Sequence, residues 1–318
     1  MKKEPILSVK DLGISFSQYT KGLRRRELEV ITNLDIDLYE GEILAVVGSS
    51  GSGKSLLAHA ILGILPDNAT TEGNIIYKGK TLTLKDKEKL RGREIVFIPQ
   101  SVNFLDPLMK VSKQVKISIE NKEKANKRQR DIFNKYGLDK KVDNLYPFEL
   151  SGGMARKVLL STALVSDCKV IIADEPTPGL DEKSLNEALK DFRNIADSGC
   201  AILMITHDIE AALKIADKIA VFYAGTTLEI ANVNDFKGDG KNLRHPYSKA
   251  LFNALPQNGF KPIKGSQPMP NELPKGCLFQ DRCECISEKC RLIRPNARMV
   301  RDGMVRCLNA TSVAFLSL

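Results

Sequence analysis

A glycine- and serine-rich octapeptide constrains the fold of this chain more than any other feature. It matches the phosphate-binding pattern G-x-x-x-x-G-K-[ST], and its residues are Gly48, Ser49, Ser50, Gly51, Ser52, Gly53, Lys54 and Ser55. In this pattern backbone N–H groups surround phosphates, the lysine reaches the outer phosphates and the last serine ligates Mg²⁺. The apolar stretch 42–47 predicts a buried strand before the loop, and residues 55–65 predict an amphipathic helix whose N-terminus favours the phosphates. The chain is therefore expected to bind a nucleotide with Mg²⁺ on an α/β fold.

Two adjacent acids follow a second apolar strand, predicted over residues 169–173. Asp174 and Glu175 are thus expected at the carboxyl edge of a parallel sheet, where ligands bind in doubly wound folds. Asp174 is placed to hold the Mg²⁺ shell, and Glu175 to polarise the attacking water as a general base. Acidic pairs at strand ends are also common on solvated surfaces, but the upstream phosphate loop favours the catalytic interpretation.

A serine and two glycines form a second candidate phosphate site. Ser151, Gly152 and Gly153 stand at the start of a helical pattern that runs to Val165, and such a helix N-terminus favours anions. Serines with glycines also cap helices in proteins that bind nothing. The position is what makes the motif informative, because it lies 23 residues before Asp174.

The order of these motifs resembles the ATPase subunits of ABC transporters, over residues 6 to about 235. The resemblance implies that the Ser151 segment is the signature motif, which contacts the γ-phosphate held by the opposite subunit, so that two sites need two chains. It also implies a Q-loop glutamine that touches metal and water, a switch histidine at the γ-phosphate, a D-loop aspartate and an aromatic residue stacked on adenine. These are Gln100, His207, Asp181 and Phe16, with Tyr19 as the alternative for adenine.

The predicted elements divide the chain into three parts. Residues 1–100 and 166–235 are expected to form a nucleotide-binding α/β core of the P-loop NTPase type, with an antiparallel β subdomain at its start. Residues 101–165 are expected to form a helical subdomain that carries the signature motif. Within it the basic stretch 121–130 has no aromatic residue to stack on bases and fits a solvated helix face. Residues 236–318 are expected to form a small C-terminal metal-binding domain.

Five of the seven cysteines lie between Cys277 and Cys307. Because cytosolic thiols stay reduced, this clustering favours a metal site over disulfides. The spacing, together with segments 244–251 and 273–283, resembles the C-terminal domain of ATPase subunits from oligopeptide, dipeptide and nickel importers, and that resemblance implies a [4Fe–4S] cluster. Four thiolates also suit tetrahedral Zn²⁺, and spacing alone leaves both metals and a metal-free packing open. The implied ligands are Cys277, Cys283, Cys290 and Cys307, with Cys285 left over.

Charge is compatible with two kinds of surface partner. The chain has a net charge of +9, and residues 239–318 hold thirteen Lys or Arg against six Asp or Glu. Such a balance suits nucleic acid or the anionic headgroups under a membrane permease. No apolar run is long enough to cross a membrane, so any passage for a solute must come from partners.

These observations predict an ATPase that energises an importer of peptides or nickel at the cytoplasmic face of the cell membrane. Its expected partners are a second ATPase chain, identical or different, two membrane permease subunits and, indirectly, an extracytoplasmic solute-binding protein. The alternative is a soluble ABC ATPase that acts on nucleic acid or ribosomes. Such proteins usually fuse two cassettes or insert coiled coils, and neither feature occurs in this sequence.

Overall fold

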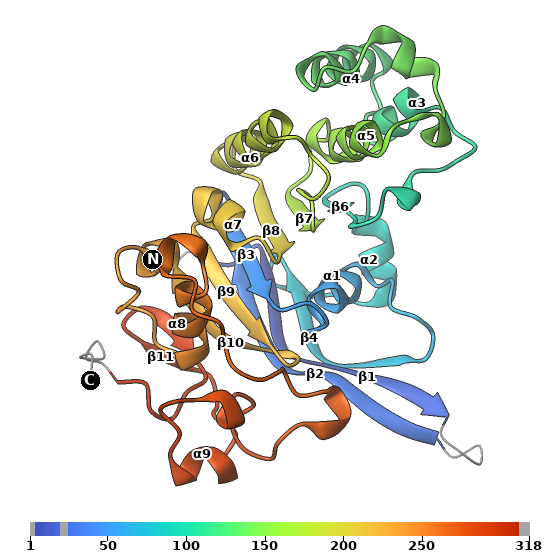
Figure 1. The fold of residues 1–318 in the computed structure, drawn as a ribbon. Helices are drawn as coiled ribbons and strands as arrows, with labels where there is room; N and C mark the ends of the chain where they lie inside the picture. Colours follow the sequence, from blue (N-terminus) through green and yellow to red (C-terminus); the bar gives the residue numbers. More distant parts are fainter. Residues whose placement is uncertain (1–3, 20–24, 312–318) are drawn as a thin grey trace.

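The computed structural model describes residues 4–19 and 25–311. Its centre is an eight-stranded sheet with the strand order β11-β12-β10-β9-β3-β8-β7-β6 (Figure 1). Five of these strands are parallel and almost wholly buried, as expected for strands that are covered on both faces. They are β3 (Ile43–Gly48), β6 (Ile95–Ile98), β7 (Val170–Asp174), β8 (Ala201–Thr206) and β9 (Lys218–Tyr223). The strands predicted over residues 42–47 and 169–173 are confirmed to within one residue by β3 and β7.

Three antiparallel strands extend one edge of this sheet. They are β10 (Thr226–Asn232), which follows β9 through the predicted turn at Gly225, and the two C-terminal strands β11 (Arg298–Val300) and β12 (Gly303–Val305). β12 pairs with β10, so backbone hydrogen bonds join the C-terminal segment to the nucleotide-binding core. The sequence analysis did not anticipate this pairing, because three-residue strands carry no readable periodicity.

A second, antiparallel sheet of four strands packs against the first, with the order β2-β1-β4-β5. It consists of β1 (Leu7–Tyr19), β2 (Arg25–Leu38), β4 (Ala69–Tyr77) and β5 (Lys80–Thr81). The predicted β-rich start is confirmed by β1 and β2. The strands β4 and β5 were missed, since β4 is half polar and follows the phosphate-loop helix without a strong alternating pattern.

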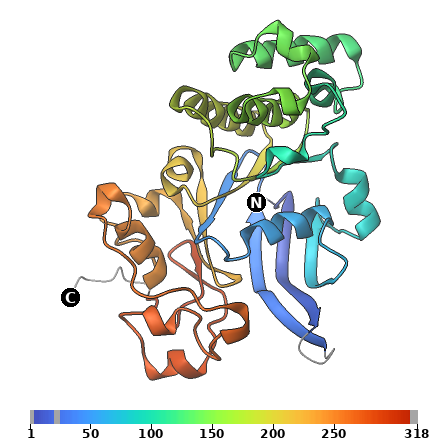
Figure 2. The same ribbon diagram turned by 45° about the vertical axis from the view of Figure 1, so that its right-hand side comes forward.

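The helices fall into two groups (Figures 1 and 2). Three of them form a lobe at one end of the main sheet. The helix of this lobe that carries the basic stretch, α4, is mostly exposed to solvent as predicted, and its buried residues are Ala125, Gln129 and Phe133. The lobe consists of α3 (Val111–Lys116), α4 (Lys122–Lys135) and α5 (Gly152–Leu164). The others are α1 (Lys54–Leu62), α2 (Leu84–Leu90), α6 (Glu182–Asp197), α7 (Ile209–Ile215), α8 (Pro246–Asn253) and α9 (Glu288–Leu292).

The main sheet separates two hydrophobic cores. Along β3, Ile43, Ala45 and Val47 pack into one core, and Leu44 and Val46 into the other. The alternation follows the two-residue period of a strand. One core is shared with the helical lobe and the C-terminal segment, and the other with the antiparallel sheet and α1. Within the described parts of the chain, no helix has the length and apolar character needed to span a membrane.

Candidate nucleotide site

The phosphate loop turns tightly because two of its glycines have no room for a side chain. A Cβ on Gly48, the last residue of β3, would lie 2.3 Å from the carbonyl oxygen of Phe222. Gly53 caps α1 with φ of 96°, and a Cβ there would lie 2.6 Å from Cδ1 of Ile31. Only glycine fits both constraints. The loop therefore leads directly from β3 into the N-terminus of α1, where backbone N–H groups favour phosphate.

Lys54 lies folded inside the loop. Its side chain is buried, and Nζ donates to the carbonyl oxygens of Gly48 and Ser49, both at 2.9 Å. Burial lowers the pKa of Lys54, and the nearby charges of Glu175 and Asp174 partly offset this effect. An ammonium group whose partners are neutral carbonyls gains by exchanging them for phosphate oxygens, since charge-assisted hydrogen bonds are stronger.

Asp174, the last residue of β7, meets the phosphate loop at Ser55. Only 2% of the residue is exposed, and its Oδ1 has no hydrogen-bond partner among the described residues. Burial raises the pKa of Asp174, and a hydrogen bond with Ser55 opposes the rise. An unpartnered buried carboxylate oxygen next to a serine hydroxyl is a suitable donor set for Mg²⁺, which prefers hard oxygen ligands. Two of the three residues predicted to contact magnesium, Ser55 and Asp174, are thus side by side.

Glu175 has an unusual backbone conformation, and its carboxylate faces His207. Its φ is 48°, a left-handed value that is uncommon for a side chain other than glycine. Its amide donates to the carbonyl of Ile205 at 2.8 Å, and its carboxylate accepts from the amide of His207 at 3.1 Å and the hydroxyl of Thr206 at 3.3 Å. Strained residues of this kind cluster at functional sites.

The ring of His207 completes this contact, with Nδ1 at 2.8 Å from Oε1 of Glu175. The two groups share one hydrogen bond through Nδ1 and Oε1. The side chain of His207 is 64% exposed, which leaves Nε2 available to a ligand. The structure therefore brings together the predicted general base and the predicted switch histidine, which lie 32 residues apart in the chain.

Arg156 is a site residue that the sequence analysis missed. It is 3% exposed and donates from one guanidinium nitrogen to the carbonyls of Pro99, at 3.1 Å, and Gln100, at 2.7 Å. A second nitrogen donates to the carbonyl of Glu175. Burial lowers the pKa of Arg156, and the charges of Glu175 and Asp174 counteract this. The available signal was an arginine on the apolar face of the helix that follows the signature serine.

The signature segment lies on the helical lobe. Ser151 caps α5 and accepts a hydrogen bond from the amide of Met154 at 3.3 Å, while Gly152 begins the helix with nothing within 4 Å of its would-be side chain. Ser151 and Gly152 are exposed, and Gly153 is partly exposed. In the described chain, no hydrogen bond joins this segment to the phosphate loop.

Asp181 caps α6 and accepts from both the amide and the hydroxyl of Ser184, at 2.9 and 2.8 Å. These hydrogen bonds hold the pKa of Asp181 well below its usual range. Gln100 follows β6 as predicted, and its side chain is exposed. Phe16 is half-buried on β1 and packs against a core, whereas Tyr19 is 65% exposed and accepts hydrogen bonds from Arg25. The adenine contact of Phe16 stays a prediction.

The cysteine segment gathers three buried thiols without forming a metal site. Cys277, Cys290 and Cys307 are buried, Cys283 is partly exposed and Cys285 is exposed. Burial raises the pKa of Cys277 to about 11, and the neighbouring thiols of Cys307 and Cys290 add to the rise. In residues 4–19 and 25–311, however, no group of three or more His, Cys, Asp or Glu side chains is placed to hold a metal ion. The expected iron–sulfur or zinc centre is therefore not shown by this arrangement of side chains.

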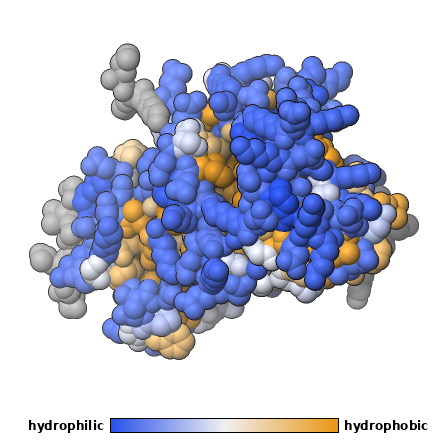
Figure 3. All heavy atoms as spheres, turned by 90° about the horizontal axis from the view of Figure 1, so that it is seen from above, coloured by the Kyte–Doolittle hydropathy of each residue, from blue (hydrophilic) through white to orange (hydrophobic). Residues whose placement is uncertain are grey.

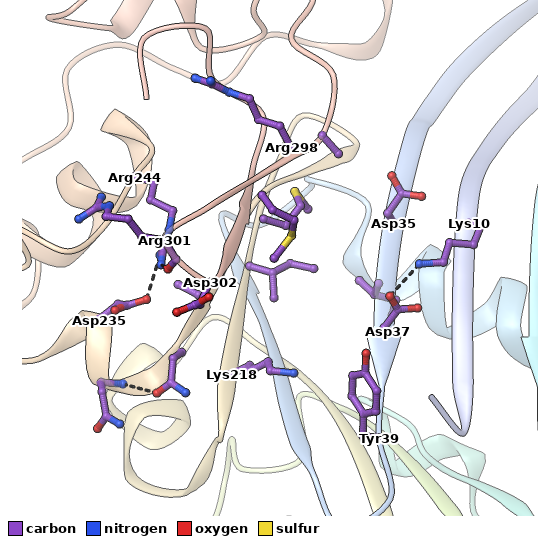
Figure 4. A pocket seen from close by; sticks show the side chains of 18 residues that line it. Lys10, Asp35, Asp37, Tyr39, Lys218, Asp235, Arg244, Arg298, Arg301 and Asp302 are labelled. Atoms are coloured by element: carbon purple, nitrogen blue, oxygen red, sulfur yellow. Dashed lines mark hydrogen bonds and ion pairs between the residues drawn. The ribbon is translucent and has the colours of Figure 1, made fainter. Parts of the chain in front are cut away.

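A cavity of about 690 Å³ lies away from the phosphate loop, between β2 and the strands β10 to β12. Figure 4 shows its charged side chains, several of which are already paired. Nζ of Lys10 forms an ion pair with the carboxylate of Asp37 at 2.7 Å, and the guanidinium of Arg244 forms one with the carboxylate of Asp235 at 2.8 Å. None of the sequence-predicted site residues lines it. Its location excludes it as the nucleotide site.

Known proteins place the chain in a family. A family model described as "ABC transporter" matches residues 31–178, and one described as "Oligopeptide/dipeptide transporter, C-terminal region" matches residues 228–290. The dipeptide transport ATP-binding protein DppD of Bacillus subtilis is 32% identical over 94% of this chain and 93% of its own length. The chain belongs to the oligopeptide/dipeptide family of ABC transporter ATP-binding subunits. The oligopeptide transport ATP-binding protein OppD of Escherichia coli is 35% identical over 92% of this ABC subunit and 89% of its own length.

Solved structures identify the fold of this ABC subunit. A structure titled as the ATP-binding subunit of an ABC transporter covers 73% of the chain with a TM-score of 0.61 and 22% identity. The dimeric ATP-binding cassette MJ0796 bound to ADP and Pi covers 71% of the chain, and 98% of that structure is matched, with a TM-score of 0.62 and 24% identity. The predicted ABC ATPase fold is confirmed. As a member of this family, the subunit is an ATPase that uses ATP with Mg²⁺.

Arg156 yields the first prediction. Arg156→Met removes the hydrogen bonds that hold Gln100 and Glu175 while filling a similar volume, so kcat for ATP should fall by at least about tenfold, because small displacements of reacting groups are costly. MgATP affinity should change little, and Arg156→Lys should be intermediate because it lacks the planar fork. Steady-state ATPase assays and nucleotide titrations measure both. The exposed Arg291→Met is the control, and an unchanged kcat in folded Arg156→Met would refute the positioning role.

Proposed function

We propose that this ABC ATPase energises the import of short peptides by hydrolysing ATP at sites shared between two ATPase chains. The observation that carries the proposal is the grouping of Lys54, Asp174, Glu175 and His207 at one edge of the sheet, while Ser151 stands exposed on a separate lobe. The relatives named above are peptide transport proteins, which favours peptides over nickel. No observation favours the alternative of a soluble ATPase that acts on nucleic acid.

Each residue of the group has a role that follows from its contacts. Lys54 exchanges its two carbonyl partners for phosphate oxygens, and Ser55 with Asp174 holds Mg²⁺, which would neutralise phosphate charge when bound. Glu175 accepts a proton from water as the general base. His207 contacts Glu175 through Nδ1 and leaves Nε2 on its exposed side chain available to a phosphate. His207 thereby links the base to the nucleotide, and Gln100 adds a contact to metal and water.

The dimer supplies what a single chain lacks. Ser151 and the glycines after it present a free helix N-terminus that suits the γ-phosphate of a nucleotide on the opposite chain. Asp181 lies at the start of α6, beside Gly179, whose carbonyl oxygen faces Gly153. We infer that these segments dock together on the partner. The partner is an identical chain or a second ATPase of the same family.

The helical lobe offers a surface for membrane partners. Figure 3 views the molecule from the side of this lobe and shows a mostly polar surface with separate apolar patches. Four large apolar side chains are exposed in the segment between β6 and α5, and contiguous exposed apolar surface marks interaction sites. They are Phe104, Leu108, Ile117 and Phe148. We propose that two permease subunits bind here, at the cytoplasmic face of the membrane, and receive solute from an extracytoplasmic binding protein.

Glu175→Gln tests the catalytic assignment. The amide keeps the shape of the side chain but cannot take a proton, so MgATP should still bind while turnover falls by at least about a hundredfold. Nucleotide-bound dimer should accumulate and be visible by size-exclusion chromatography with ATP. Exposed Glu182→Gln at the start of α6 is the matched control. Steady-state turnover at the wild-type rate in Glu175→Gln would contradict the proposal.

We also propose, on the family resemblance, that the cysteine segment binds a metal centre through Cys277, Cys283, Cys290 and Cys307. The burial of three of these thiols next to one another supports it, as does the hydrogen bond from the amide of Cys277 to the carbonyl of Cys290 at 2.8 Å. The side chains must close further to ligate a metal, because they do not do so in this structure.

Metal analysis of anaerobically purified protein decides between the alternatives. A [4Fe–4S] cluster predicts brown protein with about four iron and four sulfide per chain, which bleaches in air, whereas zinc predicts colourless protein with one metal ion. Cys290→Ser should lose the metal, and Cys285→Ser should keep it. Protein that holds neither metal, or that loses it only with Cys285→Ser, would show that these ligands are wrong.

A further inference from the structure

A C-terminal segment reaches the phosphate loop directly. Residues 263–267, here called the strap, run over the loop on the side of His207. The hydroxyl of Ser49 donates to Oε1 of Gln267 at 2.8 Å, across 218 positions of sequence. A small cavity of about 380 Å³ lies between the strap and the loop, and its polar lining includes Ser49, His207, Tyr247 and Arg282.

Ser49 is the loop residue whose carbonyl also accepts from Lys54, at 2.9 Å. One residue therefore connects the strap to the ammonium that faces the phosphates. Tyr247 of α8 lines the same cavity as Ser49, and hydrogen bonding with Ser49 opposes the rise that burial causes in the pKa of Tyr247. The position of Ser49 is thus set by C-terminal side chains on one side and by Lys54 on the other.

Arg282 holds the strap in place. Its Nε donates to the carbonyl of Lys264 at 2.8 Å, and another guanidinium nitrogen donates to the hydroxyl of Tyr223 at 3.2 Å. Tyr223 ends β9, which pairs with β3 just before the phosphate loop. Arg282 also directly precedes Cys283, so the strap is anchored at the junction of the sheet and the cysteine segment.

We propose that the C-terminal segment is part of the nucleotide site, in which Gln267, held through Arg282, positions Ser49 and preorganises the phosphate loop for MgATP. This inference rests on the proposed function. A phosphate loop binds by converging backbone N–H groups, so a fixed loop loses less freedom on binding than a mobile one. Gln267 is a positioning residue, since it touches the loop and not the reacting atoms. The strap also gives the cysteine segment a direct mechanical connection to the ATP site.

The test is a double-mutant cycle on MgATP affinity in the full chain, measured by titration with fluorescent ATP. Gln267→Ala should raise Kd for MgATP by roughly threefold to tenfold, the range expected for one net hydrogen bond. In a Ser49→Ala background the same change should have no further effect, because the partner is already gone. Gln257→Ala, an exposed glutamine ten residues earlier, should leave Kd unchanged.

Arg282→Gln provides a second test of the same proposal. It releases the strap without touching the loop, so it should also weaken MgATP binding, and its effect should be less than additive with Gln267→Ala. Unchanged or tighter MgATP binding in folded Gln267→Ala, with Tm as the folding control, would overturn the inference. Equal losses with and without Ser49 would overturn it as well. If wild-type protein fails to bind MgATP at all, the proposed function fails instead, so the two failures are distinguishable.

Discussion

The parallel pairing of β3, β8 and β7 is the constraint on which the rest of this structure depends. Their register aligns Val47 with Thr206 and Asp174 with Ile205, so the three strands end at one level. The phosphate loop, the acidic pair and the histidine leave the sheet from these ends. Residues separated by more than a hundred positions therefore share one site, and the left-handed turn at Glu175 directs its carboxylate toward His207.

Two further connections link that site to parts of the chain outside the sheet. Arg156 joins the helical lobe to the carbonyls of Gln100 and Glu175, and Ser49 joins the loop to the C-terminal strap. The first connection comes from the lobe that we propose to contact the membrane partners, and the second from the strap, which Arg282 joins to the cysteine segment. Through these two contacts the site is joined both to the helical lobe and to the C-terminal segment.

The residues that could be predicted from sequence are those whose role depends on local context. The phosphate loop needs only a strand before it and a helix after it, and the acids need only a buried strand, so both could be predicted from the sequence around them. Arg156 and Gln267 were not predictable, because their importance lies in contacts across 19 and 218 positions. The short strands β11 and β12 were missed for lack of periodicity. Cysteine spacing predicted a metal centre that side-chain placement does not support.

The central claim is that each ATP is hydrolysed between two chains, and Ser151→Arg tests it most directly. Ser151 is exposed, and in the described structure it accepts hydrogen bonds from the amides of Met154 and Ala155 in its own helix, so the change should leave the loop of the same chain intact. In assembled dimer we expect MgATP affinity to be retained while hydrolysis falls to background, because the bulky cation blocks closure onto the opposite nucleotide. Hydrolysis at the wild-type rate would contradict a shared site.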